Sequence, residues 1–170
     1  MAASGDPAGT QPVETEWLDN EQLQAWKALI VLTQLLPGSL DRQLMSDAGL
    51  AHSDYAVLAT LSAAPNRRLR MSDLAAMMDY SLSRLSHAMT RIEKAAWVKR
   101  ESCNEDKRVY YAVLTERGAS VLAEAAPGHV AHVKNLVFDH LSDTQVRQLG
   151  EIAEAILANL ARRNGCATER

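Results

Sequence analysis

The chain has 170 residues, 47% of them hydrophobic, and a formal charge of −3, which suits one domain or one domain with a helical arm. No stretch approaches the ~18 apolar residues of a membrane span, and the N-terminus has no signal-peptide pattern, so we expect a cytoplasmic protein without a membrane partner. Two cysteines do not make a disulfide framework. Residues 1–16, rich in Ala, Gly, Ser and Pro, and residues 165–170 are expected to be disordered tails.

Positive charge is concentrated in the middle of the chain. Residues 65–108 hold ten Lys and Arg but only six Asp and Glu, a local charge of +4, so the remainder of the chain carries −7. A basic segment between acidic flanks is typical of a DNA-reading surface attached to a helical body.

The first predicted helix lies within residues 17–50. Asp19 and Gln22 have the spacing of a capping box at its start, and Gly49 is expected to end it. Pro37–Gly38 should kink or split this helix, because proline has no amide donor.

Residues 51–118 have the order of a winged helix-turn-helix, in which two short helices and a turn precede a β-ribbon. Ser53, Ser72 and Ser81 are expected to cap the second, third and fourth helices of the chain. Met77 is expected to point inward from the third helix.

The fourth predicted helix, Ser81–Ala96, is amphipathic. Its apolar face contains Leu82, Leu85, Met89, Ile92 and Ala96. Its other side carries hydrogen-bonding side chains, namely Ser83, Arg84, Ser86, His87, Thr90, Arg91 and Lys94. A major groove displays acceptors, so this side favours DNA reading, with Arg84 as the candidate for a bidentate guanine contact. An ordinary solvated amphipathic helix explains the pattern of this helix equally well.

A basic hairpin follows the fourth helix. Val98–Cys103 and Val109–Leu114 are rich in β-branched residues and are predicted to form a two-stranded ribbon. Its base and tip carry Lys99, Arg100, Lys107 and Arg108. Beside a recognition helix, such a tip reaches the minor groove, where narrow A·T-rich segments attract arginine. The alternative is an ordinary charged turn.

The C-terminal part is predicted to be helical. Thr115 should cap a fifth helix that is interrupted at Pro127–Gly128 and runs to about His140, and Ser142–Gln145 is a capping box for a sixth. The apolar stripe of the sixth helix consists of Val146, Leu149, Ala153, Ile156 and Leu160. Such stripes exceed what a compact DNA-binding module could bury, which favours a homodimer built across a two-fold axis. An intrachain bundle is the alternative.

Several motifs together are those of one known family. Asp106-Lys107-Arg108 followed by Leu114-Thr115-Glu116-Arg117-Gly118 matches its wing signature, and Met71–Ala75 and Ser83–His87 match its two central helices. In these residues the chain resembles the MarR family of bacterial transcription regulators. The resemblance implies an obligate homodimer with a triangular body and a recognition helix at residues 81–96. It also implies that Arg108 is the minor-groove residue of the wing tip and that Asp106 supports it.

The expected fold is therefore mainly α-helical. A winged helix-turn-helix lobe at residues 51–118, with a two-stranded β wing, joins a dimerisation arm made of residues 17–50 and 119–164. The candidate DNA-binding residues are Ser72, Ser81, Ser83, Arg84, Ser86, His87, Thr90, Arg91, Lys94, Lys99, Arg100, Lys107 and Arg108, with Asp106 as wing support.

The resemblance also implies a cleft for a small phenolic or aromatic effector between the arm and the lobe. By analogy its lining would be Trp26, Leu29, Thr33, His52, Tyr55 and His129. Ordinary core packing is the favoured alternative for the apolar members of this set. His129 and His132 are too few for a zinc site, and Cys103 is expected to be a passive thiol rather than a redox sensor.

We expect a sequence-specific regulator that binds double-stranded DNA as a homodimer, represses a pseudo-palindromic operator and is relieved by a small ligand. No catalytic constellation appears, so no enzyme activity, metal or cofactor is expected. The first alternative is a winged-helix protein-interaction scaffold, whose wing should expose apolar residues. The second is a small-molecule carrier with a vestigial DNA lobe.

Overall fold

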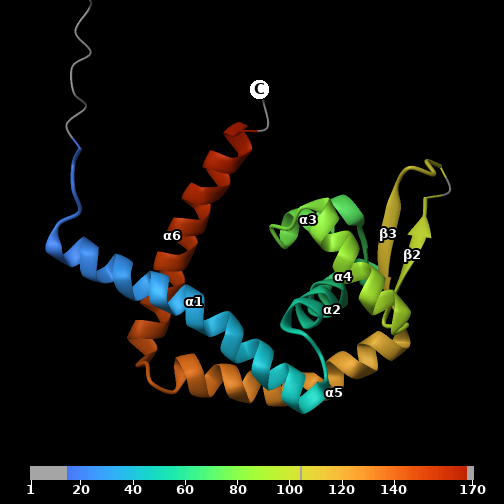
Figure 1. Ribbon diagram of the computed structural model, residues 1–170, viewed down its shortest axis with the longest axis horizontal. Helices are drawn as coiled ribbons and strands as arrows, with labels where there is room; N and C mark the ends of the chain where they lie inside the picture. Colours follow the sequence, from blue (N-terminus) through green and yellow to red (C-terminus); the bar gives the residue numbers. More distant parts are fainter. Residues whose placement is uncertain (1–14, 104, 168–170) are drawn as a thin grey trace, which may run out of the picture. The chain divides into compact units, whose positions relative to one another are not determined.

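The computed structural model describes residues 15–103 and 105–167 (Figure 1). Most of the tails predicted at 1–16 and 165–170 therefore lie outside the described residues, at 1–14 and 168–170. The chain divides after Leu36 into two compact units. It is mainly helical with a small antiparallel sheet, as predicted. No helix in the described ranges combines the length and apolarity that crossing a bilayer requires.

Helix α1 runs from Asn20 to Ala48. At its start the Asp19 amide donates to Gln22 Oε1 (3.0 Å) and the Gln22 amide donates to Asp19 Oδ1 (2.8 Å), which confirms the predicted capping box. At its end Gly49 adopts a φ of +60°, a left-handed conformation that stops the helix as predicted.

Pro37 lies inside α1, so the predicted split of this helix is wrong. A proline removes one backbone hydrogen bond, but the turns on either side of it keep their own. The segment after the proline is also fixed by packing, because Leu44 is fully buried in the core of the second unit.

Helix α2 runs from His52 to Ala63, and its cap differs from the prediction. The N-cap position is Ala51, which provides no side-chain acceptor. Instead, Asp41 of α1 accepts a hydrogen bond from the His52 amide at 2.9 Å. The prediction that Ser53 caps this helix is therefore wrong, because an acceptor from another helix has taken that role.

The wing belongs to a sheet of three strands rather than two. Strands β2 (Val98–Ser102) and β3 (Tyr110–Leu114) pair antiparallel as predicted, and β1 (Arg68–Arg70) pairs with the other edge of β3. The sequence did not predict β1, because three residues are too few to show the alternating pattern of a strand. This strand directly follows a 3-10 turn at Pro65–Arg67.

Helices α3 (Met71–Met77) and α4 (Leu82–Lys94) pack with α2 and the sheet around one core. Its fully buried large residues are Leu44, Leu50, Val57, Leu58, Leu61, Leu74, Leu85, Met89 and Ile92. Three predictions of an inward position are wrong: Met77 is 67% exposed, Leu82 is 61% exposed, and Ala96 is exposed just after the end of α4. Each lies at or next to an end of its helix, beyond the neighbouring elements that cover the middle.

Helix α5 runs from Glu116 to Val133 and is continuous through Pro127, so the predicted interruption there is wrong. The regular α-helix ends later, where residues Lys134–Phe138 form a π-helical turn. Thr115 caps α5 as predicted, accepting from the Gly118 amide at 3.0 Å.

Helix α6 runs from Asp143 to Ala167, three residues into the stretch predicted as a C-terminal tail. Its capping box is confirmed: the Ser142 amide donates to Gln145 Oε1 at 2.9 Å and the Gln145 amide donates to Ser142 Oγ at 3.4 Å. The side chains of α6 are almost all exposed up to residue 162.

The start of α5 packs tightly against the chain between α4 and β2. The Thr115 amide donates to the Trp97 carbonyl at 3.0 Å, and the Thr115 hydroxyl donates to the Ala96 carbonyl at 2.8 Å. A Cβ atom on Gly118 would lie 2.1 Å from the Trp97 oxygen. Only glycine fits at this position of the helix.

We therefore expect Gly118→Ala to lower the free energy of unfolding by about 1–3 kcal/mol or more, because the methyl group must displace backbone. The matched control is Gly128→Ala in the same helix, where the nearest atoms are 3.6 Å away. That variant should be as stable as the parent or more stable by about 0.5–1 kcal/mol through helix propensity. Urea unfolding measures both, and equal stability of the two variants would contradict the close contact.

Candidate nucleic-acid interface

Helix α4 presents one polar side to solvent. Ser81 caps it, accepting a hydrogen bond from the Arg84 amide at 3.1 Å. The inward side is buried at Leu85, Ala88, Met89 and Ile92. The outward side, called the reading face below, consists of the exposed residues Ser83, Arg84, His87, Thr90 and Lys94. Five of the seven residues predicted on this side of the helix therefore lie at the surface together, whereas Ser86 is half-buried and Arg91 is paired with an acid of α2.

The Arg84 guanidinium lies over the ring of Tyr80, 3.9 Å from its centroid. This cation–π contact holds the charge beside the start of α4 without using its hydrogen-bond donors. The guanidinium therefore remains able to donate two parallel hydrogen bonds, which is the geometry that reads guanine.

Arg91 is held by an acid that the sequence analysis missed. Its Nε donates to Asp54 Oδ2 at 2.8 Å, and its Nη2 donates to Asp54 Oδ1 and to the Ser53 hydroxyl. Asp54 is 3% exposed, and its hydrogen bond raises the pKa of Arg91. The spacing of Asp54 from Val57, Leu58 and Leu61 places it on the buried side of α2, and that spacing was the available signal.

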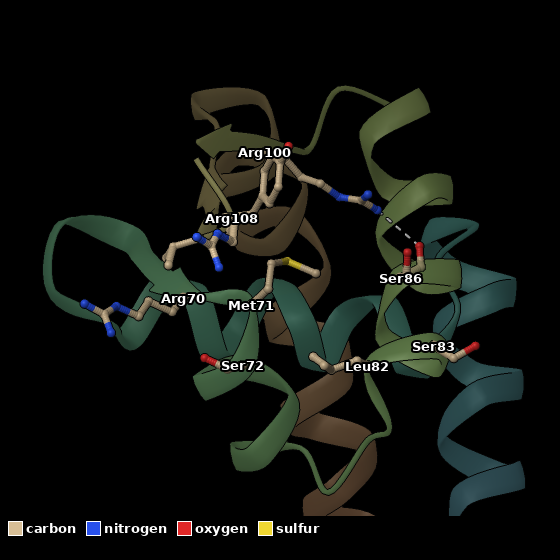
Figure 2. Close-up of a pocket in the computed structure, with 10 residues that line it drawn as sticks. Arg70, Met71, Ser72, Leu82, Ser83, Ser86, Arg100 and Arg108 are labelled. Atoms are coloured by element: carbon tan, nitrogen blue, oxygen red, sulfur yellow. Dashed lines mark hydrogen bonds between the residues drawn. The ribbon is translucent and has the colours of Figure 1, made fainter. Parts of the chain in front are cut away.

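A groove of about 790 Å³ lies between α4 and the wing (Figure 2). Its polar lining consists of Arg70, Ser72, Ser83, Ser86, Arg100 and Arg108, and its apolar lining of Met71, Leu82, Val109 and Tyr110. No described residue in this lining is acidic. This wing groove brings together five predicted DNA-binding residues from α3, α4 and the wing, and it adds Arg70 of β1, which the sequence analysis missed.

Arg100 joins the wing to α4. Its Nε lies 3.1 Å from Glu93 Oε2, and its Nη2 donates to the Ser86 carbonyl at 3.2 Å. The Arg100 amide also donates to Glu93 Oε1 at 3.0 Å. The ion pair with Glu93 and the two hydrogen bonds to α4 tie β2 to this helix, so Arg100 orients the wing relative to the helix.

The tip of the wing is exposed, and the described part of it begins again at Glu105. The Arg108 side chain is 96% exposed, while its amide donates to Asp106 Oδ1 at 2.9 Å. The predicted pair of tip arginine and supporting aspartate is thus brought together. Lys107 is also exposed, whereas Lys99 forms an ion pair with Glu101 at 2.7 Å, which lowers the pKa of that carboxyl.

A second hollow of about 490 Å³ lies on the other flank of α4. It is lined by Ser53, Tyr80, Ser81, Ser83, Arg84, His87, Ala88 and Arg91. The start of α4 is therefore flanked on both sides by basic, serine-rich hollows.

Ser72 is placed differently from its prediction. Helix α3 begins at Met71 without a side-chain cap, and the Ser72 hydroxyl donates to Asp73 at 3.0 Å.

Three of the predicted effector-cleft residues lie together where α2 meets α5. The Tyr55 ring is 4.4 Å from that of His129 and the His52 ring is 6.1 Å from it. His129 is 8% exposed and bonds to Gln43 at 3.1 Å, and burial lowers its pKa.

The other three predicted cleft residues lie before the break between the two units. Trp26 is 51% exposed, Leu29 is 36% exposed, and the Thr33 hydroxyl donates to the Ile30 carbonyl at 2.9 Å. His132 lies on α5 and contacts the Ser39 hydroxyl at 3.3 Å. In the described ranges, no three His, Cys, Asp or Glu side chains are grouped as a metal site would require.

Known proteins resemble the chain over the lobe and beyond it. A MarR family model matches residues 48–109. The crystal structure of Sco3205, a MarR family transcriptional regulator from Streptomyces coelicolor in complex with DNA, is 45% identical. The match covers 86% of this chain and 92% of Sco3205, with a TM-score of 0.82. The crystal structure of AbsC, a MarR family transcriptional regulator from the same organism, is 38% identical in sequence. The match covers 86% of this chain and 99% of AbsC, with a TM-score of 0.81.

Among curated proteins, the transcriptional repressor MprA of Escherichia coli K12 is 25% identical over 118 residues, which is 69% of this chain. The match spans 66% of that repressor, just under two thirds of its length. These relatives are regulators of transcription, in agreement with the prediction that the chain is not an enzyme. Identity of 38–45% over most of both Streptomyces structures shows that the chain belongs to the MarR family of transcriptional regulators.

Proposed function

We propose that this protein binds double-stranded DNA sequence-specifically as a homodimer and represses transcription from a pseudo-palindromic operator. The observation that carries the proposal is the reading face of α4, whose exposed side chains donate hydrogen bonds and include no acid. Two basic hollows flank it. The Streptomyces relative at 45% identity is in complex with DNA, and the Escherichia coli relative is named a repressor.

In this proposal α4 enters the major groove and the wing reaches the adjacent minor groove. Arg84 donates to a guanine edge from its position beside Tyr80. Arg108, with its side chain almost fully in solvent, enters a narrow A·T-rich minor groove. The hydroxyls of Ser83 and Ser86 donate to phosphates, which position the protein without reading sequence.

The proposed dimer rests on apolar side chains that the chain leaves exposed. On α6 these are Leu149, Ile152, Ile156, Leu157 and Leu160, at 39–63% exposure. The N-terminal part of α1 likewise exposes Trp26, Val31, Leu32 and Leu35. Exposed apolar surface of this extent favours a partner, and a second copy of the chain supplies an equivalent surface across a two-fold axis.

A small aromatic or phenolic effector is proposed as the signal that relieves repression. The cluster of Tyr55, His52 and His129 supports this, because it sets aromatic rings beside polar groups at the base of the lobe. An effector shifts the protein only through different affinities for its two states. The scaffold alternative is disfavoured because an interaction wing should expose mainly apolar residues. The exposed residues of this tip are the charged Glu105, Asp106, Lys107 and Arg108, with Tyr110 as an exposed apolar neighbour on β3.

The first test is the salt dependence of binding to duplex DNA. A dimer presents the basic lobe twice, so each binding event releases counterions from several phosphates. With about six phosphates contacted, affinity should fall by roughly 10³-fold between about 50 and 200 mM salt. Mobility shifts on genomic fragments at rising salt measure this, and a flat dependence would contradict DNA binding as the function.

Arg84→Ala and Arg108→Ala should change DNA binding in different ways. Loss of a base-edge contact costs about 1–3 kcal/mol and relaxes sequence preference at one position of each half-site. Loss of the wing tip should instead weaken binding mainly at sites with A·T-rich flanks. Arg147→Ala on α6 removes the same charge outside the lobe and is the control. Selection from randomised duplexes measures all three, and uniform losses for both lobe variants would mean that neither residue reads sequence.

Ile156→Glu should dissociate the dimer. Burial of the isoleucine side chain contributes about 1.5–3 kcal/mol, whereas burial of the glutamate charge is costly. The two-fold axis places the change in both copies of the interface. Ala158→Glu, which adds the same charge on the opposite side of α6, is the matched control. Light scattering over a dilution series follows the oligomer. A dimer that survives Ile156→Glu unchanged, or one that Ala158→Glu disrupts equally, would mean that the interface lies elsewhere.

A further inference from the structure

Leu82 is an apolar residue whose side chain is not covered by the rest of the lobe. It is the first residue of α4 and is 61% exposed, whereas Leu85 and Met89 on the same side of the helix are fully buried. The first turn of α4 projects beyond the core, so the apolar stripe of the helix continues into solvent by one residue.

The wing groove that Leu82 lines combines arginine and serine side chains with the apolar residues Met71, Val109 and Tyr110. Ser72 and Ser83 lie near Leu82, as Figure 2 shows, and Arg70 and Arg108 lie farther along the same groove. No described residue of the lining carries a negative charge. An occupant of this groove is therefore expected to be an anion that nevertheless offers a small apolar group at the start of α4.

Duplex DNA has one such group on its major-groove edge. The phosphates match the arginines and serines, and the 5-methyl group of thymine is the apolar feature of the base edges there. The N-terminal residues of a recognition helix are those that reach base edges. Leucine has no hydrogen-bonding atoms in its side chain, so a methyl contact is the base readout open to it.

We propose that Leu82 determines specificity by contacting the 5-methyl group of a thymine in each operator half-site. This inference rests on the proposed function, since it names one base contact of the same interface. It adds to the hydrogen-bonding contacts a residue that discriminates thymine from cytosine by shape, because cytosine has no methyl group at that position.

The experiment removes the two contacting groups separately. The full chain first selects a duplex from randomised DNA, and each thymine of that duplex is then replaced by deoxyuridine, which lacks only the methyl group. Affinities are measured for the wild-type chain and for Leu82→Ala. Alanine keeps the helix, since it has the highest helix propensity, and unchanged urea unfolding checks that the variant is folded.

At one thymine per half-site, loss of the methyl should weaken the wild type by about fourfold per half-site, the worth of one buried methyl group. Leu82→Ala should bind more weakly and lose this difference at that thymine alone. Met77→Ala is the control, because Met77 is also exposed, at 67%, but does not line the wing groove. It should keep the wild-type response at every position.

Other results would overturn the inference. If Leu82→Ala kept wild-type affinity, or stayed as sensitive to every methyl as the wild type, Leu82 would face solvent or another protein in the complex. If no thymine were sensitive in the wild type, the contact would not exist although the protein binds DNA. If the wild type selected no duplex, the proposed function itself would be wrong, and this inference with it.

Discussion

The orientation of α4 depends on a buried carboxylate. Asp54 on α2 is almost completely removed from solvent, and a charge in that position is very costly unless it is paired. Arg91 supplies the pairing with two of its nitrogens. Because Arg91 is part of α4, the requirement to neutralise Asp54 fixes the rotation of that helix about its axis. The reading face points outward because the opposite side of α4 is buried at Leu85, Met89 and Ile92, and the pairing of Arg91 with Asp54 holds the same rotation.

A second set of polar contacts extends this constraint to the sheet. Arg100 on β2 reaches both Glu93 and the Ser86 carbonyl of α4. The wing is therefore aligned with the helix by hydrogen bonds and not by apolar packing alone. The wing groove follows from these two ties, since one fixes the rotation of α4 and the other fixes the strand that faces it. Arginine contributes to both because its planar group donates several hydrogen bonds in fixed directions.

The sequence predicted most contacts between groups within one helical turn, although Ser72 does not cap α3, which begins one residue earlier. Ser81 and Thr115 cap their helices as predicted, because donor and acceptor are three residues apart. Ser53 was wrong for the opposite reason: the acceptor that α2 uses, on Asp41, comes from another helix. Leu82 fits the periodicity of a buried face, yet the core ends before it. Of the interface, residue types and order were therefore predictable, whereas the Asp54 pairing required knowledge of which helices meet.

The contact between Asp41 and the His52 amide has a mechanical consequence. It closes the short connection between α1 and α2 into a small ring whose closing link is one hydrogen bond. A carboxylate at this site also meets the positive end of the α2 dipole, and such caps contribute about 0.5–2 kcal/mol. The last turns of α1 and the first turn of α2 are thus held together twice, by this hydrogen bond and by the burial of Leu44 and Leu50 in the core. Any change in the angle between the two helices must therefore displace core side chains as well as break this bond.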